Sequence, residues 1–476
     1  MHSHTRRTAD LFAVFCFLTV FLGLAASALR VTVSSPEDLL ALAAAVNGGD
    51  EAYDGAEVVL TKDLDMEGYA FTPVGTGTHP FTGTFDGGGH VISGVTITSY
   101  TEENVFVEVN NKGVSYRRVP LGFFGRAHNA VIRDLGLRGV TFDVTAQTGD
   151  SLYAGLLCGY FSGDTDGGEY GVERCFAAGE LTATSFRASV DAGGLIGRLA
   201  DTGMGVTLFV KNVHADADVC AIAGSSTLAR IGGIVGNFNI SQVFSTAVLS
   251  RVRYAGALSG KGAMIYAGGV CGWANVDNSW GVGELDWEHH EIVEGTFECV
   301  LTDATGDFDG NSVYAGSVIG YTTTVSPVKV YTNAGNAFTV GGNKYPVAGT
   351  GVSLSQFSNE TFLSNTLGFD MATVWRIADG LPVLRTAEAP LTVKTVSRES
   401  GTLAVTVCCG IAESGGKLFC AIYDAAGRLL DTGIVSAQSE STFSFADREN
   451  AAFVKAFLLD GDCCPLCPAA SAAVGD

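Results

Sequence analysis

The residues best suited to chemistry gather in one polar segment, ELDWEHHEIVEG, at positions 284–295. Trp287, His289 and His290 place an indole ring beside two imidazoles, and such a group suits contact with a ligand. The segment also begins like the zinc-peptidase pattern His-Glu-x-x-His, but Glu294 stands where the second histidine should be. Two imidazoles one helical turn apart are therefore missing, and no catalytic zinc site is predicted. A ligand-binding loop and a solvated loop are both open interpretations.

Acidic side chains suggest a second kind of site. Two glycine-containing loops, predicted at 163–169 and 303–311, carry aspartates at alternating positions, and carboxylate oxygens on a tight turn are ligands that Ca²⁺ prefers. In the second loop these residues are Asp303, Asp307 and Asp309. Neither loop has the twelve-residue spacing that ends in glutamate, so calcium is one interpretation and a solvated acidic loop is the other. No other cofactor is predicted.

Twelve cysteines raise the question of disulfides or a bound metal. Cys158 and Cys271 occupy an apolar slot of a repeated motif, where free cysteine serves as a small apolar side chain. Six others lie near the C-terminus. They are Cys408, Cys409, Cys420, Cys463, Cys464 and Cys467. Adjacent cysteines have poor spacing for chelation, which favours disulfides or free thiols over a metal site.

Other catalytic patterns do not occur in the sequence. The glycine-rich stretch at 85–90 does not lie between a strand and a helix, which argues against a phosphate-binding loop. There is no Gly-x-Ser-x-Gly turn and no Cys–His pairing. On stacked coils, a carboxylate pair for glycoside chemistry would come from neighbouring coils, so the sequence does not single one out.

A six-residue motif recurs along the chain that carries these residues. It reads AGLLCG at 154–159, AGGLIG at 192–197, IGGIVG at 231–236, AGGVCG at 267–272, AGSVIG at 315–320 and, more loosely, PLGFFG at 120–125. Successive copies start 34 to 48 residues apart, which is typical of stacked repeats or propellers. The apolar fourth and fifth positions, flanked by glycine, predict a buried strand beside a bend.

The spacing predicts one three-sided coil per repeat, with short strands and loops at the corners. In the unit at 192–230 the strands are predicted at 194–196, 206–213 and 217–222. Equivalent positions of stacked coils form ladders with a spacing of about 4.8 Å. One such ladder is assigned to Leu135, Phe176, His214, Phe244, Trp280 and Tyr331. A propeller would need hairpin turns such as Asn-Gly within each unit, and the repeats contain none.

The N-terminal part is predicted to hold a signal and a cap. Two arginines, an apolar run at 11–26 and a small-residue cleavage site predict a secretory signal peptide at 1–28. Ser35 is suited to begin a helix at 36–49 that covers the open end of the stack. The cap and the first coils occupy 29–119.

The repeats and a closing segment are assigned to 120–385, and a short helix is expected at 351–366. Alternating apolar residues at 391–462 predict a small Ig-like β-sandwich. The cysteine-containing tail, 463–476, is expected to be irregular. The predicted fold class is therefore all-β.

Composition and charge limit the classes of partner that the chain could bind. The chain of 476 residues is 47% hydrophobic, has 62 glycines and carries a formal charge of −22. A large core is possible, but the acidic surface disfavours nucleic acid and anionic membranes as partners. Beyond the signal, no apolar stretch is long enough to span a membrane.

The stretch FTGTFDGGGHVISGVTI, the following GFFG and the recurring AGG[LIV]xG motif together resemble the bacterial GLUG-motif proteins. The opening SPEDLLALAAAVNGG and the closing WRIADGLPVL are similar to that family's ends, so the resemblance covers residues 30–385. It implies a right-handed parallel β-helix in a secreted or surface-attached protein, and the family also occurs in adhesins and beside IgA1-type metallopeptidase domains. The C-terminal part resembles β-sandwiches appended to clostridial-type surface proteins.

Two function classes follow. The favoured one is a secreted or cell-surface, non-catalytic repeat protein that binds an extracellular glycan or a host or cell-surface protein through displayed loops. The alternative is a carbohydrate-active enzyme, either a polysaccharide lyase or a glycoside hydrolase, on the same scaffold.

Overall fold

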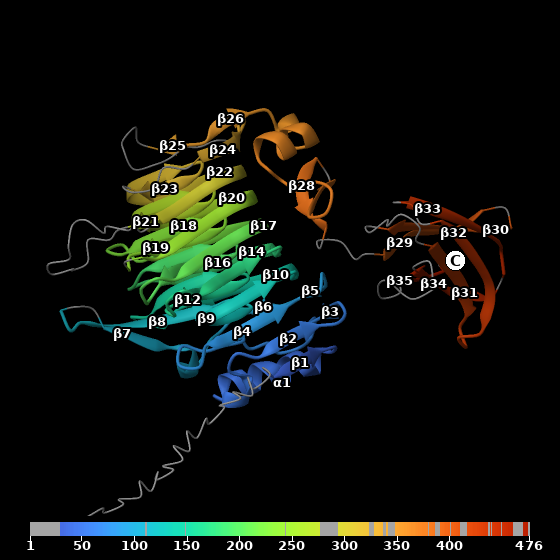
Figure 1. Cartoon of the computed structure of the whole chain (residues 1–476), viewed down its shortest axis with the longest axis horizontal. Helices are drawn as coiled ribbons and strands as arrows, with labels where there is room; N and C mark the ends of the chain where they lie inside the picture. The colour runs from blue at the N-terminus through green and yellow to red at the C-terminus, as the bar shows by residue number, and fades with distance from the viewer. Residues whose placement is uncertain are drawn as a thin grey trace, which may run out of the picture.

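The chain is all-β in the computed structural model, in which one mixed sheet of 26 strands dominates the described residues (Figure 1). The described residues also form one two-stranded sheet and two small sheets near the C-terminus. The model describes residues 29–474 apart from 110–111, 148, 243, 277–293, 323–327, 337–338, 341–347, 379, 386–390, 400, 410–416, 437, 439, 449 and 460–469.

Helix α1 (Pro36–Asn47) confirms the predicted helix and lies at the blue end of the stack, beside β1 (Arg30–Val33) (Figure 1). The Asp38 N–H donates to Ser35 Oγ at 3.1 Å, which satisfies one of the free N–H groups of the first turn. Its apolar face, which includes Leu39 and Leu42, is buried in the main core. The helix therefore covers the first coil.

The first coils are short. After η1 (Glu51–Tyr53), the strand predicted at 57–65 is divided into β2 (Glu57–Leu60) and β3 (Leu64–Asp65). The next elements are β4 (Phe81–Asp86), β5 (Val91–Ser93), β6 (Thr96–Ile97), η2 (Glu102–Asn104), β7 (Phe106–Val109) and β8 (Ser115–Leu121). Strands β7 and β8 pair antiparallel, so the polar segment before the repeats is a hairpin, and Figure 1 shows it extending from the stack.

From here each strand pairs in parallel with the strand one repeat later. The strands of the repeats are β9 (Phe124–Arg133), β10 (Gly136–Thr145), β11 (Ser151–Gly155), β12 (Cys158–Gly163), β13 (Glu169–Glu173), β14 (Phe176–Ser185), β15 (Val190–Gly193), β16 (Ile196–Asp201), β17 (Thr207–Ala223), β18 (Leu228–Gly232), β19 (Val235–Ile240), β20 (Thr246–Gly268), β21 (Cys271–Val276), β22 (Glu294–Gly316), β23 (Ile319–Thr322), β24 (Val328–Asn333) and β26 (Thr350–Val352). Strand β25 (Thr339–Val340) pairs antiparallel with β22.

The motif forms a corner, which we call the open corner. In the copy at 192–197, β15 ends at Gly193, the chain bends, and β16 begins at Ile196. A Cβ on Gly193 would stand 2.1 Å from the Ile196 carbonyl oxygen, so only glycine fits there. The fifth motif positions pair in register and are fully buried, as predicted. They are Cys158, Ile196, Val235, Cys271 and Ile319.

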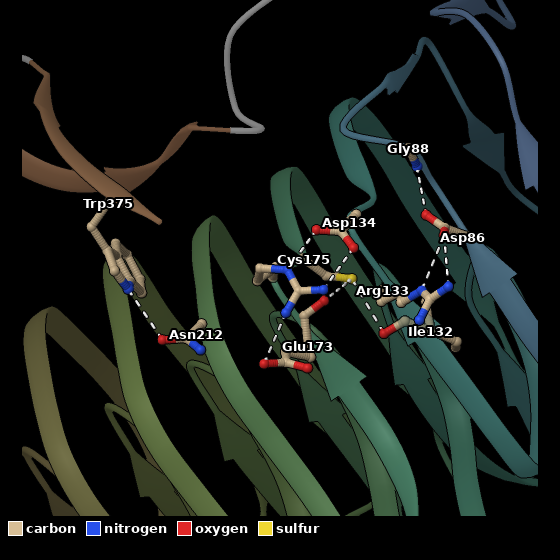
Figure 2. Close-up of polar contacts among 10 residues, drawn as sticks. Asp86, Gly88, Ile132, Arg133, Asp134, Glu173, Cys175, Asn212 and Trp375 are labelled. Atoms are coloured by element: carbon tan, nitrogen blue, oxygen red, sulfur yellow. Dashed lines mark hydrogen bonds and ion pairs between the residues drawn. The ribbon is translucent and has the colours of Figure 1, made fainter. Parts of the chain in front are cut away.

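A second corner is built without glycine, and we call it the covered corner. Its residues adopt left-handed backbone conformations with φ of 50–55°. They are Asp134, Arg174, Asn212, Arg251 and Lys329. Side chains join neighbouring coils across it. Arg174 Nε donates to Asp134 Oδ1 at 2.6 Å, and Arg251 Nε donates to Asn212 Oδ1 at 2.8 Å. Figure 2 labels Asp134 and Asn212 at this corner. Polar pairing between coils therefore fixes this corner.

The corner is covered by the closing segment, which contains η3 (Leu354–Gln356), η4 (Phe362–Thr366) and the hairpin of β27 (Trp375–Ala378) and β28 (Leu381–Leu384). The helix predicted at 351–366 is replaced by these two short helical turns. Trp375 is fully buried, and its indole Nε1 donates to Asn212 Oδ1 at 3.3 Å (Figure 2). The Leu384 N–H donates to His214 Nδ1 at 3.4 Å. The closing segment is thus fastened to the repeats by apolar and polar contacts.

The predicted aromatic ladder is partly wrong. Phe176 and His214 do pair, with ring centroids 5.0 Å apart, but the next residue in register is Arg253. Phe244 lies before β20 and is 48% exposed. Phe176, His214 and Arg253 each lie 22 residues after the start of their motif, so equal coil lengths set the register, not aromatic character.

The other ladder positions can be compared in the same way. Gly136, not Leu135, pairs with Phe176. Tyr331 does belong to this ladder, because Arg253 pairs with Leu301 and Leu301 pairs with Tyr331 on the following coils. Trp280 lies outside the described residues.

The C-terminal part forms two antiparallel sheets. One contains β29 (Leu391–Glu399), β30 (Thr402–Cys409) and β33 (Glu440–Ala446), and the other contains β31 (Lys417–Asp424), β32 (Leu429–Ser436), β34 (Ala451–Leu459) and β35 (Ala470–Ala473). Residues of both sheets share one core, which includes Val405, Phe443, Leu418 and Val454. Strand β35 corrects the expectation of an irregular tail, because Ala470–Ala473 extends the second sheet.

Candidate functional site

The sequence-predicted binding residues, Trp287, His289 and His290, lie outside the described residues. The predicted calcium residues lie on a strand, not on a loop, because β22 runs through them. Asp303 Oδ1 accepts hydrogen bonds from Asn333 and Asn336, and Asp309 pairs with Lys261 at 2.9 Å. Over the described part of the chain, no three His, Cys, Asp or Glu side chains converge as metal ligands. Calcium at these aspartates stays a prediction.

The first acidic loop holds its carboxylate differently. Asp164 accepts a hydrogen bond from Asn129 at 2.8 Å and pairs with His128 at 3.2 Å. Burial lowers the pKa of His128, although the Asp164 carboxylate opposes this. The loop at 163–169 is therefore tied to the preceding coil.

The cysteines with described side chains are free thiols in the core or beside it. Cys158, Cys175, Cys271 and Cys420 are buried, and Cys220 is half-buried. Burial raises the pKa of Cys420 to about 12, so this thiol stays protonated and unreactive. The side chains of the other five members of the C-terminal group lie outside the description. Their disulfide or metal chemistry remains a prediction.

A groove beside the open corner is a well-formed candidate site among the described residues. It has a volume of about 650 Å³, within the range of ligand pockets. Its walls come from residues that flank the motif copies between 154 and 272, from residues that follow them, and from the β7–β8 hairpin. We call it the binding groove and define it by Glu108, Arg118, Tyr153, Asp191, Arg198, Asp201, Arg230, Asn237 and Trp273, among its lining residues.

Two ladders bring these side chains together. Before the motif, parallel pairing aligns Tyr153, Asp191, Arg230, Tyr266 and Tyr314 on successive coils. After the motif, it aligns Arg126, Tyr160, Arg198, Asn237, Trp273 and Tyr321. The bend between the two positions makes the ladders face one groove. Aromatic, cationic and amide groups thus recur at the spacing of the coils, about 4.8 Å.

The β7–β8 hairpin closes one end of the groove. Phe106 stacks on Tyr160 with ring centroids 5.8 Å apart, and it also approaches Tyr153. Arg118 of the hairpin donates to Glu108 at 2.8 Å across the same hairpin. An excursion that interrupts the repeats therefore supplies both a wall and charges.

Arg198 lines the groove and contacts the Tyr153 side chain. Its Nη1 donates to the Tyr153 hydroxyl at 2.5 Å, and its guanidinium carbon lies 5.1 Å from the centre of the Tyr153 ring. Its contact with a carboxylate is longer, at 3.9 Å to Glu108 Oε1. Burial raises the pKa of Tyr153, so the phenol stays neutral. Arg198 therefore keeps its full positive charge, and its short hydrogen bond goes to a neutral phenol and not to a carboxylate.

The next coils add an ion pair and an amide. Arg230 Nη1 donates to Asp191 Oδ1 at 2.7 Å, and Asn237 Nδ2 donates to Asp191 Oδ2 at 2.7 Å. Arg230 also lies over the Trp273 ring, 4.5 Å from its centre. Both oxygens of Asp191 are thus occupied, and its charge is balanced by Arg230.

Asp201 is the remaining carboxylate of the groove. Its two oxygens accept the backbone N–H groups of Ser241 and Gln242 at 2.9 and 2.6 Å. Burial raises the pKa of Asp201, and these hydrogen bonds offset only part of the rise. Because both oxygens serve the next coil, Asp201 positions the loop after β19.

Several polar atoms in the groove have no protein partner. They are Arg198 Nε, Arg230 Nε and Asn237 Oδ1. The Asn237 side chain is only 1% exposed, so water reaches it poorly. A buried polar atom without a partner is costly, and ligand-binding sites are places where such atoms persist. Two donors and one acceptor of the residues that line the groove are therefore left unpaired by the protein.

The sequence predictions did not include this groove, because they favoured loops that interrupt the repeat. The signal was nevertheless present in the residues that flank the motif. These positions are polar or aromatic in successive copies, although the motif between them is apolar. An outward-facing Trp273 or Arg198 beside a buried motif would have indicated the groove.

Comparisons with known proteins give little further information. No family model matches the chain, and no curated protein matches it. Among solved structures, a chain described as "IgA1 Protease" is similar, with 14% identity and a TM-score of 0.35. The match covers 63% of this chain and 21% of that chain, so this chain spans about a fifth of that structure's length. A likeness of this size supports no conclusion about activity. Across the described residues, no helix has the length and apolar character needed to cross a membrane.

Proposed function

We propose that this chain is a secreted or cell-surface binding protein that holds a glycan in the binding groove. We further propose that its coils form a right-handed parallel β-helix of the GLUG-motif type, on which the groove is built. The parallel pairing of successive repeats and the signal-like N-terminus support this interpretation. The observation that carries the functional proposal is the groove itself, with buried polar atoms that have no protein partner.

The chemistry of the groove suits sugars. Glycan sites combine an aromatic face, against which a sugar ring packs, with fixed donors and acceptors for hydroxyl groups. Trp273 is half-buried at the groove wall. The two ladders continue into Tyr266 and Tyr314 before the motif and Tyr321 after it, and the rings of these tyrosines contact one another at 4.6 to 5.8 Å between centroids. An aromatic surface therefore continues from the polar part of the groove.

The alternative of a carbohydrate-active enzyme is supported by one observation, the raised pKa of Asp201 in the groove. A general acid needs such a carboxyl group. However, both oxygens of Asp201 accept backbone hydrogen bonds, and those of Asp191 hold Arg230 and Asn237. These groups are occupied by the protein, so binding without turnover is the better-supported function.

A glycan array probed with the purified chain tests the proposal, together with an assay for new reducing ends. We expect binding without release of reducing sugar. Trp273→Ala should weaken binding at least tenfold. Phe186→Ala is the matched control, because Phe186 is 67% exposed and does not line the groove. Equal binding by both variants would place the site elsewhere, and new reducing ends would favour the enzyme.

A further inference from the structure

We propose that the binding groove is specific for an acidic glycan, and that the Arg198 guanidinium binds a sugar carboxylate. This inference rests on the proposed function, because it specifies the class of glycan that the same groove takes. Hexuronic acids and sialic acids share the relevant chemistry, a carboxylate on a hydroxylated ring.

The balance of charges in the groove leads to Arg198. Three arginines line the groove. Arg118 is hydrogen-bonded to Glu108 at 2.8 Å, and Arg230 is hydrogen-bonded to Asp191 at 2.7 Å. Within the described residues, Arg198 has no carboxylate at hydrogen-bonding distance. Its contact with Glu108 is 3.9 Å long, and Arg118 already holds that carboxylate.

The remaining acid cannot serve as the counter-ion of Arg198. Both oxygens of Asp201 accept backbone N–H groups from Ser241 and Gln242, and burial favours its neutral form. The Arg198 side chain is 17% exposed, so its charge is largely removed from water. A buried cation is unfavourable without an anion, and a ligand carboxylate would supply that anion.

The groups around Arg198 match the rest of a sugar acid. Asn237 pairs with Arg198 on the next coil, and its free Oδ1 accepts from a hydroxyl group. The hydrogen bond from its Nδ2 to Asp191 leaves Oδ1 as the unpaired atom of the amide. Arg230 Nε supplies a further donor. A ligand that carries only anionic oxygens would leave the Asn237 acceptor unmatched. A sugar acid has both a carboxylate and hydroxyl groups, which match Arg198, Arg230 Nε and Asn237 Oδ1.

The order of residues along the groove gives the direction of the glycan. Arg198, Asn237 and Trp273 are equivalent positions of three successive coils. The coils lie about 4.8 Å apart, so a glycan that runs along the stack would present its acid group to Arg198 and a following ring to Trp273.

The test uses calorimetry on the purified chain with trigalacturonate, its methyl ester, sialyllactose and lactose. We expect one acidic ligand to bind at least tenfold more tightly than its neutral counterpart, and the acid that does so identifies the source. Equal affinity for acid and neutral forms, or preference for the neutral form, would overturn the inference but leave glycan binding intact. If none of the four binds and the array is also silent, both proposals fail.

Two variants test whether Arg198 causes the preference for the acidic ligand. Arg198→Gln should lose at least tenfold in affinity for the acidic ligand and leave the affinity for its neutral counterpart unchanged. The control is Arg133→Gln, because Arg133 pairs with Asp86 at 2.9 Å outside the groove (Figure 2). If Arg198→Gln fails to fold, the comparison of acid and ester on the unmodified chain still tests whether the groove prefers an acidic glycan. Equal losses in both variants would contradict the role of Arg198.

Discussion

The two corners of the repeats are built from different residues and leave different surfaces. The open corner turns on glycines that touch the backbone of the next coil, and its flanking side chains face a groove. The covered corner turns on residues with side chains in left-handed conformations, and the closing segment packs over it. Glycine at the open corner therefore lets neighbouring backbones pack closely, and the groove is lined by the side chains that flank the motif.

The partners of the polar groups show the same difference. At the covered corner the closing segment supplies them, because Trp375 donates to Asn212 and the Leu384 N–H donates to His214. At the open corner the Asn237 acceptor and the Arg198 Nε have none. Arg253 Nε and Arg385 Nε near the covered corner also lack a hydrogen-bond partner, so the contrast lies in the cover: the closing segment packs over one corner, and we infer that a ligand occupies the groove at the other. The following predictions test this contrast.

The largest effect is expected at the open corner. Gly193→Ala would place a Cβ 2.1 Å from the Ile196 carbonyl oxygen and 2.7 Å from the Gly236 nitrogen. These are backbone atoms that cannot move aside, so we expect a loss of about 5 kcal/mol or more in unfolding free energy. Urea denaturation measures it. Gly335→Ala is the control, because Gly335 is exposed and its Cβ would meet only Asn333 Oδ1, at 3.5 Å. Equal stability of both variants would contradict the close packing.

The covered corner should depend on Trp375. Trp375→Ala removes a fully buried indole that contacts Phe369 at 4.5 Å and His214 at 6.1 Å between ring centroids. We expect a loss of about 3–5 kcal/mol in the stability of the closing segment. Limited proteolysis around 354–385 should report it. Glycan affinity should stay unchanged, and a parallel loss of binding would show that the corners are coupled.

Acid should weaken the covered corner. Burial lowers the pKa of His214 well below its usual value, and Arg253, Arg376 and Arg138 lower it further. Asp216 lies 3.5 Å from His214 Nε2 but is held by Arg253 through two hydrogen bonds, so it does not reverse the shift.

The sign of the pH effect follows from this shift. The unfolded chain takes up the proton near the ordinary value of about 6.5, whereas the folded chain resists it, so stability falls as the pH drops below that value. Urea midpoints between pH 7.5 and 5 measure the loss. His214→Gln retains a hydrogen-bond acceptor but does not titrate, so its urea midpoint should fall less between pH 7.5 and 5. An identical slope would assign the effect to other groups.

The smallest effect is expected from the ion pair between coils. Asp134→Asn weakens a double hydrogen bond with Arg174, whose side chain is about one-third exposed. Solvent screens such pairs, so we expect a loss below about 1 kcal/mol. Thermal unfolding in low and high salt should show a difference that salt reduces. A larger, salt-independent loss would mean that Asp134 acts through its left-handed backbone.

Much of the scaffold could be predicted because it depends on local rules. Ser35 and the acidic first turn specify α1, and alternating apolar residues specify the two C-terminal sheets. The motif's apolar pair predicts the fully buried ladder that contains Ile196 and Val235. The β35 strand was missed because its small residues carry no strand pattern until β34 offers an edge.

The sequence by itself determined which residues are buried, because burial follows from apolar type and from repeat spacing. Only the tertiary structure decided which outward-facing residues meet. The register that aligns Arg253 with His214 depends on backbone pairing and on loop lengths between strands. The groove needs the motif's bend to bring Arg198, Asn237 and Arg230 together, and it needs the β7–β8 hairpin as a wall. Contacts between coils join residues 45 and 46 positions apart, so hydrogen bonding across the stack, not local sequence, created the site.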